Sequence, residues 1–195
     1  MTPSVNFDRL QDYVQSSDWN ERDTLVKTHF PYSPSCSYLD RDDVRVLVSF
    51  RNIPDSVISW FHHQARLGQV AASAKDAWLG EQGRACAKSV STYRRSWRAS
   101  GLALMLPYEK LVDDPETGIA SILKFLGKDQ TAFSLAEIAR QTQVRLKPGE
   151  APRDGNHVRT AGRSVATEEI PQALLREFLD MEADMETGLG ASVPC

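Results

Sequence analysis

Residues 44–50, Val44-Arg45-Val46-Leu47-Val48-Ser49-Phe50, are the clearest strand signal in the chain. The run is apolar at nearly every position, which is typical of a strand whose two faces are both covered. Arg51-Asn52-Ile53-Pro54 then predicts a turn. Asp55 is expected to cap a helix over residues 56–66, which Gly68 ends. A strand, a tight turn and a helix therefore stand at the centre of the predicted fold.

Strand and helix signals alternate on both sides of this unit. A short strand is expected at 24–28 and a third apolar strand at 102–106, directly after Gly101. The alternation favours an α/β fold with a mainly parallel sheet flanked by helices. Residues 69–83 carry no decisive pattern, and the glycine-containing stretch 147–166 is expected to be a long functional loop. The expected helices are 7–16, 84–99, 115–126, 132–140 and 168–186.

Length and composition indicate one domain spanning residues 1–195. The net charge of −3 excludes a protein that coats nucleic acid through bulk positive charge. The chain has 16 Arg against 7 Lys, and guanidinium groups suit local recognition of phosphate. Its three cysteines have no zinc-site spacing, so no metal site is expected. The same cysteine pattern favours a cytoplasmic location. Neither a signal peptide nor an apolar run long enough for the membrane is visible, and the oligomeric state stays open.

Several polar side chains follow the predicted strands. Lys27 and His29 come after the first, Arg51 and Ser59 after the second, and Tyr108 and Glu109 after the third. The carboxyl ends of parallel strands meet at one edge of a sheet, where ligands bind in such folds. The N-terminus of the helix after Arg51 is expected to face the same edge and to favour an anion. A phosphate-bearing nucleotide fits this set, with Tyr108 available to an adenine ring.

Four ordered segments carry a resemblance to a known family. Val26-Lys27-Thr28-His29-Phe30-Pro31 resembles the KTHxP segment of the sulfotransferases that use 3′-phosphoadenosine 5′-phosphosulfate (PAPS). Residues 51–59 resemble their 3′-phosphate motif, an Arg after a strand with a Ser eight residues later. Pro107-Tyr108-Glu109-Lys110-Leu111-Val112-Asp113-Asp114-Pro115 resembles their YEDLxxDP segment, and 122–127 the IxxFLG that follows. The resemblance runs from about residue 24 to 180.

The resemblance implies a sulfotransferase fold, similar to that of P-loop kinases, and transfer of a sulfuryl group from PAPS to a hydroxyl or amine. It implies that His29 is the general base, and imidazole does exchange protons near neutral pH. It implies that Lys27 stabilises the leaving phosphate. The acceptor would be a small molecule, and neither nucleic acid nor membrane is an expected partner. The residues expected to bind PAPS are Arg51, Ser59, Tyr108, Thr142 and Arg159.

The sequence also departs from the family pattern. The family opens with a strand and a glycine-containing Pro-Lys-Ser-Gly-Thr-Thr loop around the 5′-phosphosulfate, whereas the first glycine here is Gly68. The first strand and its loop are therefore expected to be missing. An alternative is a non-catalytic module, derived from a sulfotransferase, that binds a 3′-phosphonucleotide or a partner. A nucleotide-kinase relative is disfavoured, because no Gly-x-x-x-x-Gly-Lys loop is present.

Overall fold

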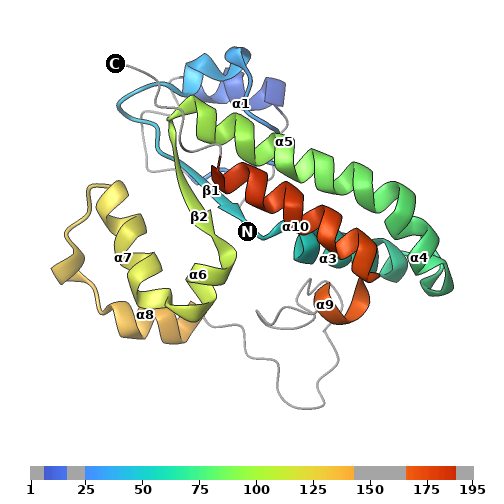
Figure 1. Ribbon diagram of the computed structural model, residues 1–195. Coiled ribbons are helices and arrows are strands. Elements are labelled where there is room, and N and C mark those ends of the chain that lie inside the picture. The colour runs from blue at the N-terminus through green and yellow to red at the C-terminus, as the bar shows by residue number, and fades with distance from the viewer. Residues whose placement is uncertain (1–6, 17–24, 143–165, 188–195) are drawn as a thin grey trace. The chain divides into compact units, whose positions relative to one another are not determined.

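The computed structural model describes residues 7–16, 25–142 and 166–187. These residues are mostly helical, with one small parallel sheet of two strands, β1 (Val46–Phe50) and β2 (Ala103–Pro107), as Figure 1 shows. The arrangement agrees with the α/β class predicted from the sequence. The two strands begin and end within two residues of the predicted 44–50 and 102–106. Among the described residues no helix is long and apolar enough to cross a membrane.

The helices follow the order expected from the sequence with shifted ends. The helix expected at 56–66 begins three residues earlier, and the one expected at 168–186 is split near Pro171. Residues 25–28 have no regular secondary structure apart from a single bridge at Lys27, where a strand was expected. Gly68 and Gly101 lie just beyond helix ends at φ 71° and 68°, a conformation that glycine adopts without strain. The α-helices are α1 (Phe7–Val14), α3 (Ile53–Arg66), α4 (Lys75–Trp78), α5 (Arg84–Ser100), α6 (Tyr108–Asp113), α7 (Pro115–Phe125), α8 (Leu135–Thr142), α9 (Ala166–Glu169) and α10 (Gln172–Thr187).

The strand β1 is not covered on both faces, so that prediction was wrong. Val48 is buried, whereas Leu47 and Ser49 on either side of it are exposed. Side chains of a strand alternate between its two faces, so only the face that carries Val48 lies against the interior. The apolar run reflects β-propensity as well as burial, because valine and leucine tolerate a half-exposed sheet surface.

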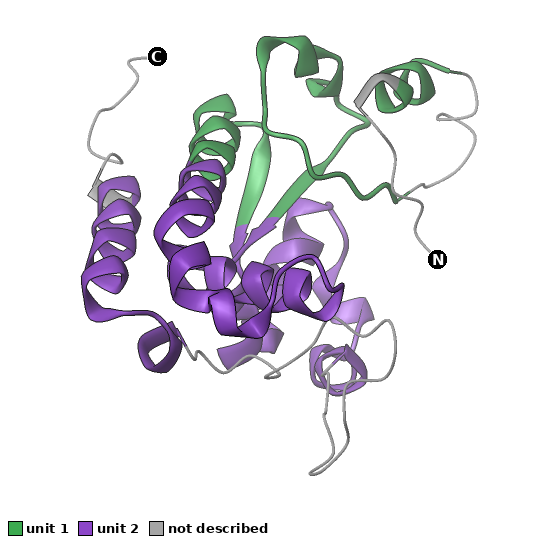
Figure 2. Cartoon of the chain, turned by 90° about the vertical axis from the view of Figure 1, so that its right-hand side faces the viewer, with its two compact units in different colours: residues 1–48, 92–105 green, residues 49–91, 106–195 purple. Residues whose placement is uncertain are grey.

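The chain divides into two compact units, which Figure 2 colours separately. Unit 1 comprises residues 1–48 and 92–105. Its core gathers side chains from α1, from a 3-10 helix over Pro34–Leu39, from β1 and from α5. Trp97 is the largest buried side chain of this unit. Its ring packs against the rings of Tyr32 and Phe30, with centroids 5.4 Å and 6.3 Å away. The buried members are Leu10, Val14, Cys36, Leu39, Val44, Val48 and Trp97.

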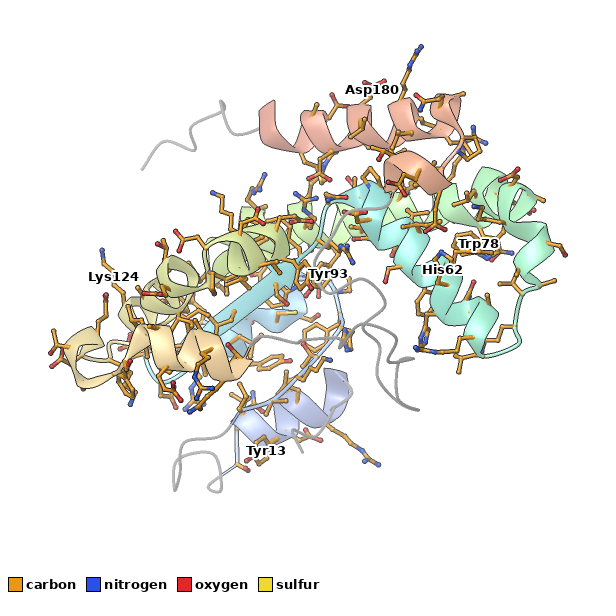
Figure 3. The ribbon with its side chains drawn as sticks, turned by 90° about the horizontal axis from the view of Figure 1, so that it is seen from below. Tyr13, His62, Trp78, Tyr93, Lys124 and Asp180 are labelled. Atoms are coloured by element: carbon orange, nitrogen blue, oxygen red, sulfur yellow. The ribbon has the colours of Figure 1, made fainter. Side chains whose placement is uncertain are left out.

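Unit 2 comprises residues 49–91 and 106–195. Its core lies where α3 packs against α10 and α9 and against the segment 75–83, which continues α4 as a π-helix over Leu79–Gly83. Trp78, which Figure 3 labels, packs on Phe61 of α3 with ring centroids 5.4 Å apart. Its Nε1 donates to Gln64 Oε1 at 2.9 Å. Phe178 of α10 is fully buried. The apolar face of α3 is thus held from several sides.

Candidate functional site

The turn between β1 and α3 is the best-connected part of unit 2. Asn52 is the N-cap of α3, because its Oδ1 accepts a hydrogen bond from the backbone N–H of Asp55 at 2.8 Å. The predicted cap, Asp55, instead lies in the first turn of the helix and is buried. The sequence-based assignment was therefore wrong by three residues. The physical reason is that the Asn52 side-chain amide makes two hydrogen bonds to Asp55. It accepts from the Asp55 backbone N–H and donates to the Asp55 carboxylate, so this carboxylate has a partner in its buried position.

Two carboxylates share the amide group of Asn52. Its Nδ2 donates to Asp55 Oδ2 at 2.9 Å and to Glu109 Oε1 at 2.8 Å. The same Glu109 oxygen also accepts from the backbone N–H of Asn52 at 3.0 Å. Glu109 lies at the start of α6, directly after β2. One side chain thus ties together the residues that follow the two neighbouring strands.

The first-turn N–H groups of α3 are already occupied by the protein. Glu182 of α10 accepts from the Ile53 N–H at 2.8 Å, and the Ser56 N–H donates to the Asn52 carbonyl at 3.0 Å. Asp55 donates to Asn52, and Pro54 has no N–H. The expectation that this helix terminus offers its N–H groups to an anion was wrong. A carboxylate from the protein occupies the positive end of the helix instead.

Arg51 is held at the edge of this network. Its guanidinium lies over the Tyr108 ring, 5.3 Å from the centroid, and its Nε is 3.7 Å from Asp55 Oδ2. The Nε is buried and makes no hydrogen bond within the described part of the chain. The side chain keeps 23% of its surface exposed. The exposed part of this fixed cation, rather than the buried Nε, is what an oxyanion such as a phosphate group can reach.

The structure brings Arg51 and Tyr108 together, as expected for residues that follow adjacent strands. Ser59 lies on α3 and is exposed. Thr142 is the last residue of α8, where its Oγ1 donates to the Ile138 carbonyl at 2.8 Å in the manner of an ordinary helical threonine. Arg159 lies outside the described residues.

Lys27 and His29 belong to unit 1 and face solvent. The residues that alternate with them point the other way, because Val26 and Phe30 pack on the unit 1 core. Trp97 anchors the segment further, since its Nε1 donates to the Phe30 carbonyl at 3.0 Å. In extended backbone the side chains of residues two apart share one side. Lys27 and His29 therefore both project toward solvent, and they combine a cation with a group that can accept or donate a proton.

Sequence reasoning assigned no role in this site to three of its residues. Glu109 belongs to the Tyr108-Glu109 motif, so the motif itself indicated a structural or functional role for its carboxylate. Asn52 was assigned to a turn, although Asn is a favoured N-cap residue before Pro54 in the first helical turn. Glu182 gave no signal, because acidic residues are common on an amphipathic helix such as α10. Within the described ranges, no group of three or more His, Cys, Asp and Glu is arranged to hold a metal ion.

A comparison with protein families places the chain. The family model described as the sulfotransferase domain matches residues 3–149. That range includes Lys27, His29, the Arg51 turn and the Tyr108-Glu109 pair, and it ends before α9 and α10. A search of curated proteins found no match. Since the matched segment is well over half of the chain, the protein belongs to the sulfotransferase domain family and is an enzyme of the sulfotransferase type by that membership.

Proposed function

We propose that this protein transfers a sulfuryl group from PAPS to a hydroxyl or amine of a small-molecule acceptor. The observation that carries the donor assignment is the state of Arg51, a cation held between Tyr108 and Asp55 with part of its side chain exposed to solvent. PAPS would supply the activated sulfuryl group together with a 3′-phosphate that distinguishes it from common adenine nucleotides. We treat residues 1–195 as one sulfotransferase-like domain. We expect it in the cytoplasm, where the free thiols of Cys36 and Cys86 stay reduced.

The residues of unit 2 fit the nucleotide part of such a donor. Arg51 would take the 3′-phosphate, because a guanidinium held in one orientation loses little freedom when it binds an oxyanion. Ser59 would add a hydroxyl donor from the exposed side of α3. Tyr108 would offer its ring to the adenine. Arg51 covers one face of this ring, so the adenine would contact the ring elsewhere. Thr142 and Arg159 remain proposed contacts on the strength of the family resemblance.

The residues of unit 1 fit the chemical step. His29 would accept the proton that the acceptor hydroxyl loses as it attacks. Lys27 would hold positive charge where the leaving phosphate becomes more negative. Both side chains are exposed while their neighbours are anchored in the core, so they are presented to a ligand from a fixed segment. In-line group transfer asks the protein mainly for positioning and charge stabilisation, which this pair can provide.

Calorimetry with adenosine 3′,5′-bisphosphate and with AMP tests the nucleotide assignment. The wild-type chain should prefer the bisphosphate, and Arg51→Ala should weaken its binding by about 2–4 kcal/mol because a desolvated phosphate loses a charged partner. Arg51→Lys should recover only part of this, since lysine lacks the planar fork. Arg66→Ala, an exposed arginine at the other end of α3, is the matched control and should bind normally. Equal wild-type affinity for the two nucleotides would refute the assignment.

A labelled-sulfate transfer assay over a panel of phenols, alcohols and amines tests the activity. His29→Ala should lower turnover by about 10²–10⁴-fold and leave the affinity for the bisphosphate nearly unchanged, as expected of a general base. Lys27→Ala should also act mainly on turnover. A fully active His29→Ala variant would remove His29 from the mechanism. Tight, 3′-phosphate-dependent binding without transfer to any acceptor would favour the non-catalytic module instead.

A further inference from the structure

Glu182 of α10 makes a contact that joins two parts of the chain 129 residues apart. Its Oε2 accepts the backbone N–H of Ile53 at 2.8 Å, at the first position of α3. Ile53 is completely buried, so its N–H depends on a protein partner rather than on water. A carboxylate at this place also faces the positive end of the helix dipole. The contact is therefore both strong and directional.

The preceding N–H is held in the same way. Glu109 accepts from the backbone N–H of Asn52 at 3.0 Å. Two successive backbone donors are thus taken by two carboxylates, one from α6 and one from α10. Arg51 immediately precedes these two residues, and it directly follows the last residue of β1. Its backbone is consequently fixed from both directions.

The side chain of Arg51 inherits this constraint. It has a 3.7 Å approach to Asp55 and a position over Tyr108, and both depend on where the turn places its Cα. The protein's own acceptors, Glu182 for Ile53 and Asn52 for Asp55 and Ser56, leave no first-turn N–H of α3 for a ligand. An oxyanion at this turn then depends on side-chain donors, chiefly the Arg51 guanidinium, and its binding becomes sensitive to small displacements of Arg51. In catalysis a misplacement of about 1 Å can cost roughly 100-fold in rate, and we expect an effect in the same direction on phosphate binding.

We infer that Glu182 is a positioning residue for the phosphate-binding Arg51, an inference that rests on the proposed function. Glu182 touches neither nucleotide nor acceptor; it holds the turn that aims the guanidinium. It lies beyond residue 149, where the family match ends. The C-terminal helix α10 is thereby part of the nucleotide site as well as part of the unit 2 core.

Two conservative variants separate reach from charge. Glu182→Gln keeps the side-chain length and an acceptor oxygen but loses the charge, whereas Glu182→Asp keeps the charge and is one methylene too short. Calorimetry with adenosine 3′,5′-bisphosphate and AMP gives the ratio of their dissociation constants for each variant. Glu182→Asp should lose about 10-fold or more of the preference for the bisphosphate while its affinity for AMP stays unchanged. Glu182→Gln should keep the wild-type preference. Asp180→Asn removes an acid from an exposed position of the same helix (Figure 3) and is the control.

The outcomes distinguish this inference from the proposed function. A wild-type chain without preference for the bisphosphate refutes the proposed function and the inference with it. A wild-type preference that survives in Glu182→Asp overturns the inference alone. Loss of the preference in folded Glu182→Gln also overturns it, because the charge and not the hydrogen bond to Ile53 would then matter. A merely structural role predicts equal losses for AMP and the bisphosphate, so parallel losses count against positioning as well.

Discussion

Replacing Asn52 with aspartate should destabilise this protein more than replacing it with alanine. Asparagine and aspartate are about equally good N-cap residues, and alanine in their place typically costs about 1 kcal/mol. Cap preference alone therefore predicts that Asn52→Asp is nearly neutral and that Asn52→Ala is the worse variant. The contacts of the amide nitrogen predict the opposite order.

The magnitude follows from what Nδ2 touches. It donates to Asp55 at 2.9 Å and to Glu109 at 2.8 Å, and Asp55 is only 1% exposed. Each hydrogen bond to a charged group contributes about 1.5–3 kcal/mol, and water can replace part of the loss at half-buried Glu109. We expect Asn52→Ala to cost about 2–4 kcal/mol. Asn52→Asp retains the cap but sets a third carboxylate against the other two, where like charges about 4 Å apart repel by up to roughly 4 kcal/mol. It should therefore exceed the alanine variant by at least about 1 kcal/mol.

Urea denaturation at pH 7, followed by circular dichroism, measures both variants. The excess cost of Asn52→Asp should shrink as the pH falls toward about 4, the ordinary range of carboxyl groups, because protonation of one carboxyl relieves the repulsion. In linkage terms, the folded variant binds more protons than the unfolded chain, so its stability falls as the pH rises. Asp114→Asn is the control: Asp114 caps α7 by accepting from Thr117 N at 3.2 Å, and the exchange there should change the urea midpoint far less. If Asn52→Asp is as stable as the wild type, or more stable than Asn52→Ala, the reasoning fails.

Three further predictions concern the core, a thiol and an exposed turn. Phe178→Ala should cost about 3–5 kcal/mol in urea denaturation because the ring is fully buried in unit 2, whereas exposed Leu179→Ala should cost less than about 0.5 kcal/mol. Burial raises the pKa of the Cys86 thiol to about 11, so iodoacetamide at pH 8 should label it roughly 100-fold more slowly in the folded chain than in urea, as mass spectrometry of its peptide would show. Hydrogen bonds from Thr131 hold the pKa of Asp129 below its ordinary 3.8, so its carboxylate stabilises the folded state at neutral pH and this contribution is lost as the pH falls through and below that value. Wild type and Asp129→Asn should accordingly approach each other in urea midpoint as the pH falls below 3.8, and a gap that widens on acidification would contradict the assignment.

Local signals in the sequence predicted the order of the elements. The apolar run at 44–50 and the run after Gly101 became β1 and β2, and Pro115 begins α7 as a first-turn proline should. These signals act between residues close in sequence, so they survive whatever the rest of the chain does. Residues 69–83 carried no such pattern. Their helical structure follows from the burial of Trp78 and Leu79 against α3, a tertiary contact.

The candidate site divides in the same way. That Arg51 and Tyr108 would meet was predictable, because each follows a strand and parallel neighbours end at one edge. That Lys27 and His29 would project to the same side of the chain was predictable from their spacing of two residues. The true cap of α3 was not, because Asn52 and Asp55 are both good caps and only the position of Glu109 decides between them.

The sequence alone thus determined which residue types follow the strands, and with them the family to which the chain belongs. It could not determine which acids hold the Arg51 turn. Glu109 is 57 residues from Asn52 and Glu182 is 129 residues from Ile53, and neither separation leaves a periodic trace in the sequence. Hydrogen bonds of this kind depend on tertiary packing, of α3 against α10 for Glu182 and of β1 beside β2 for Glu109. Tertiary structure therefore decided how the cation is oriented, because orientation depends on contacts that no local preference encodes.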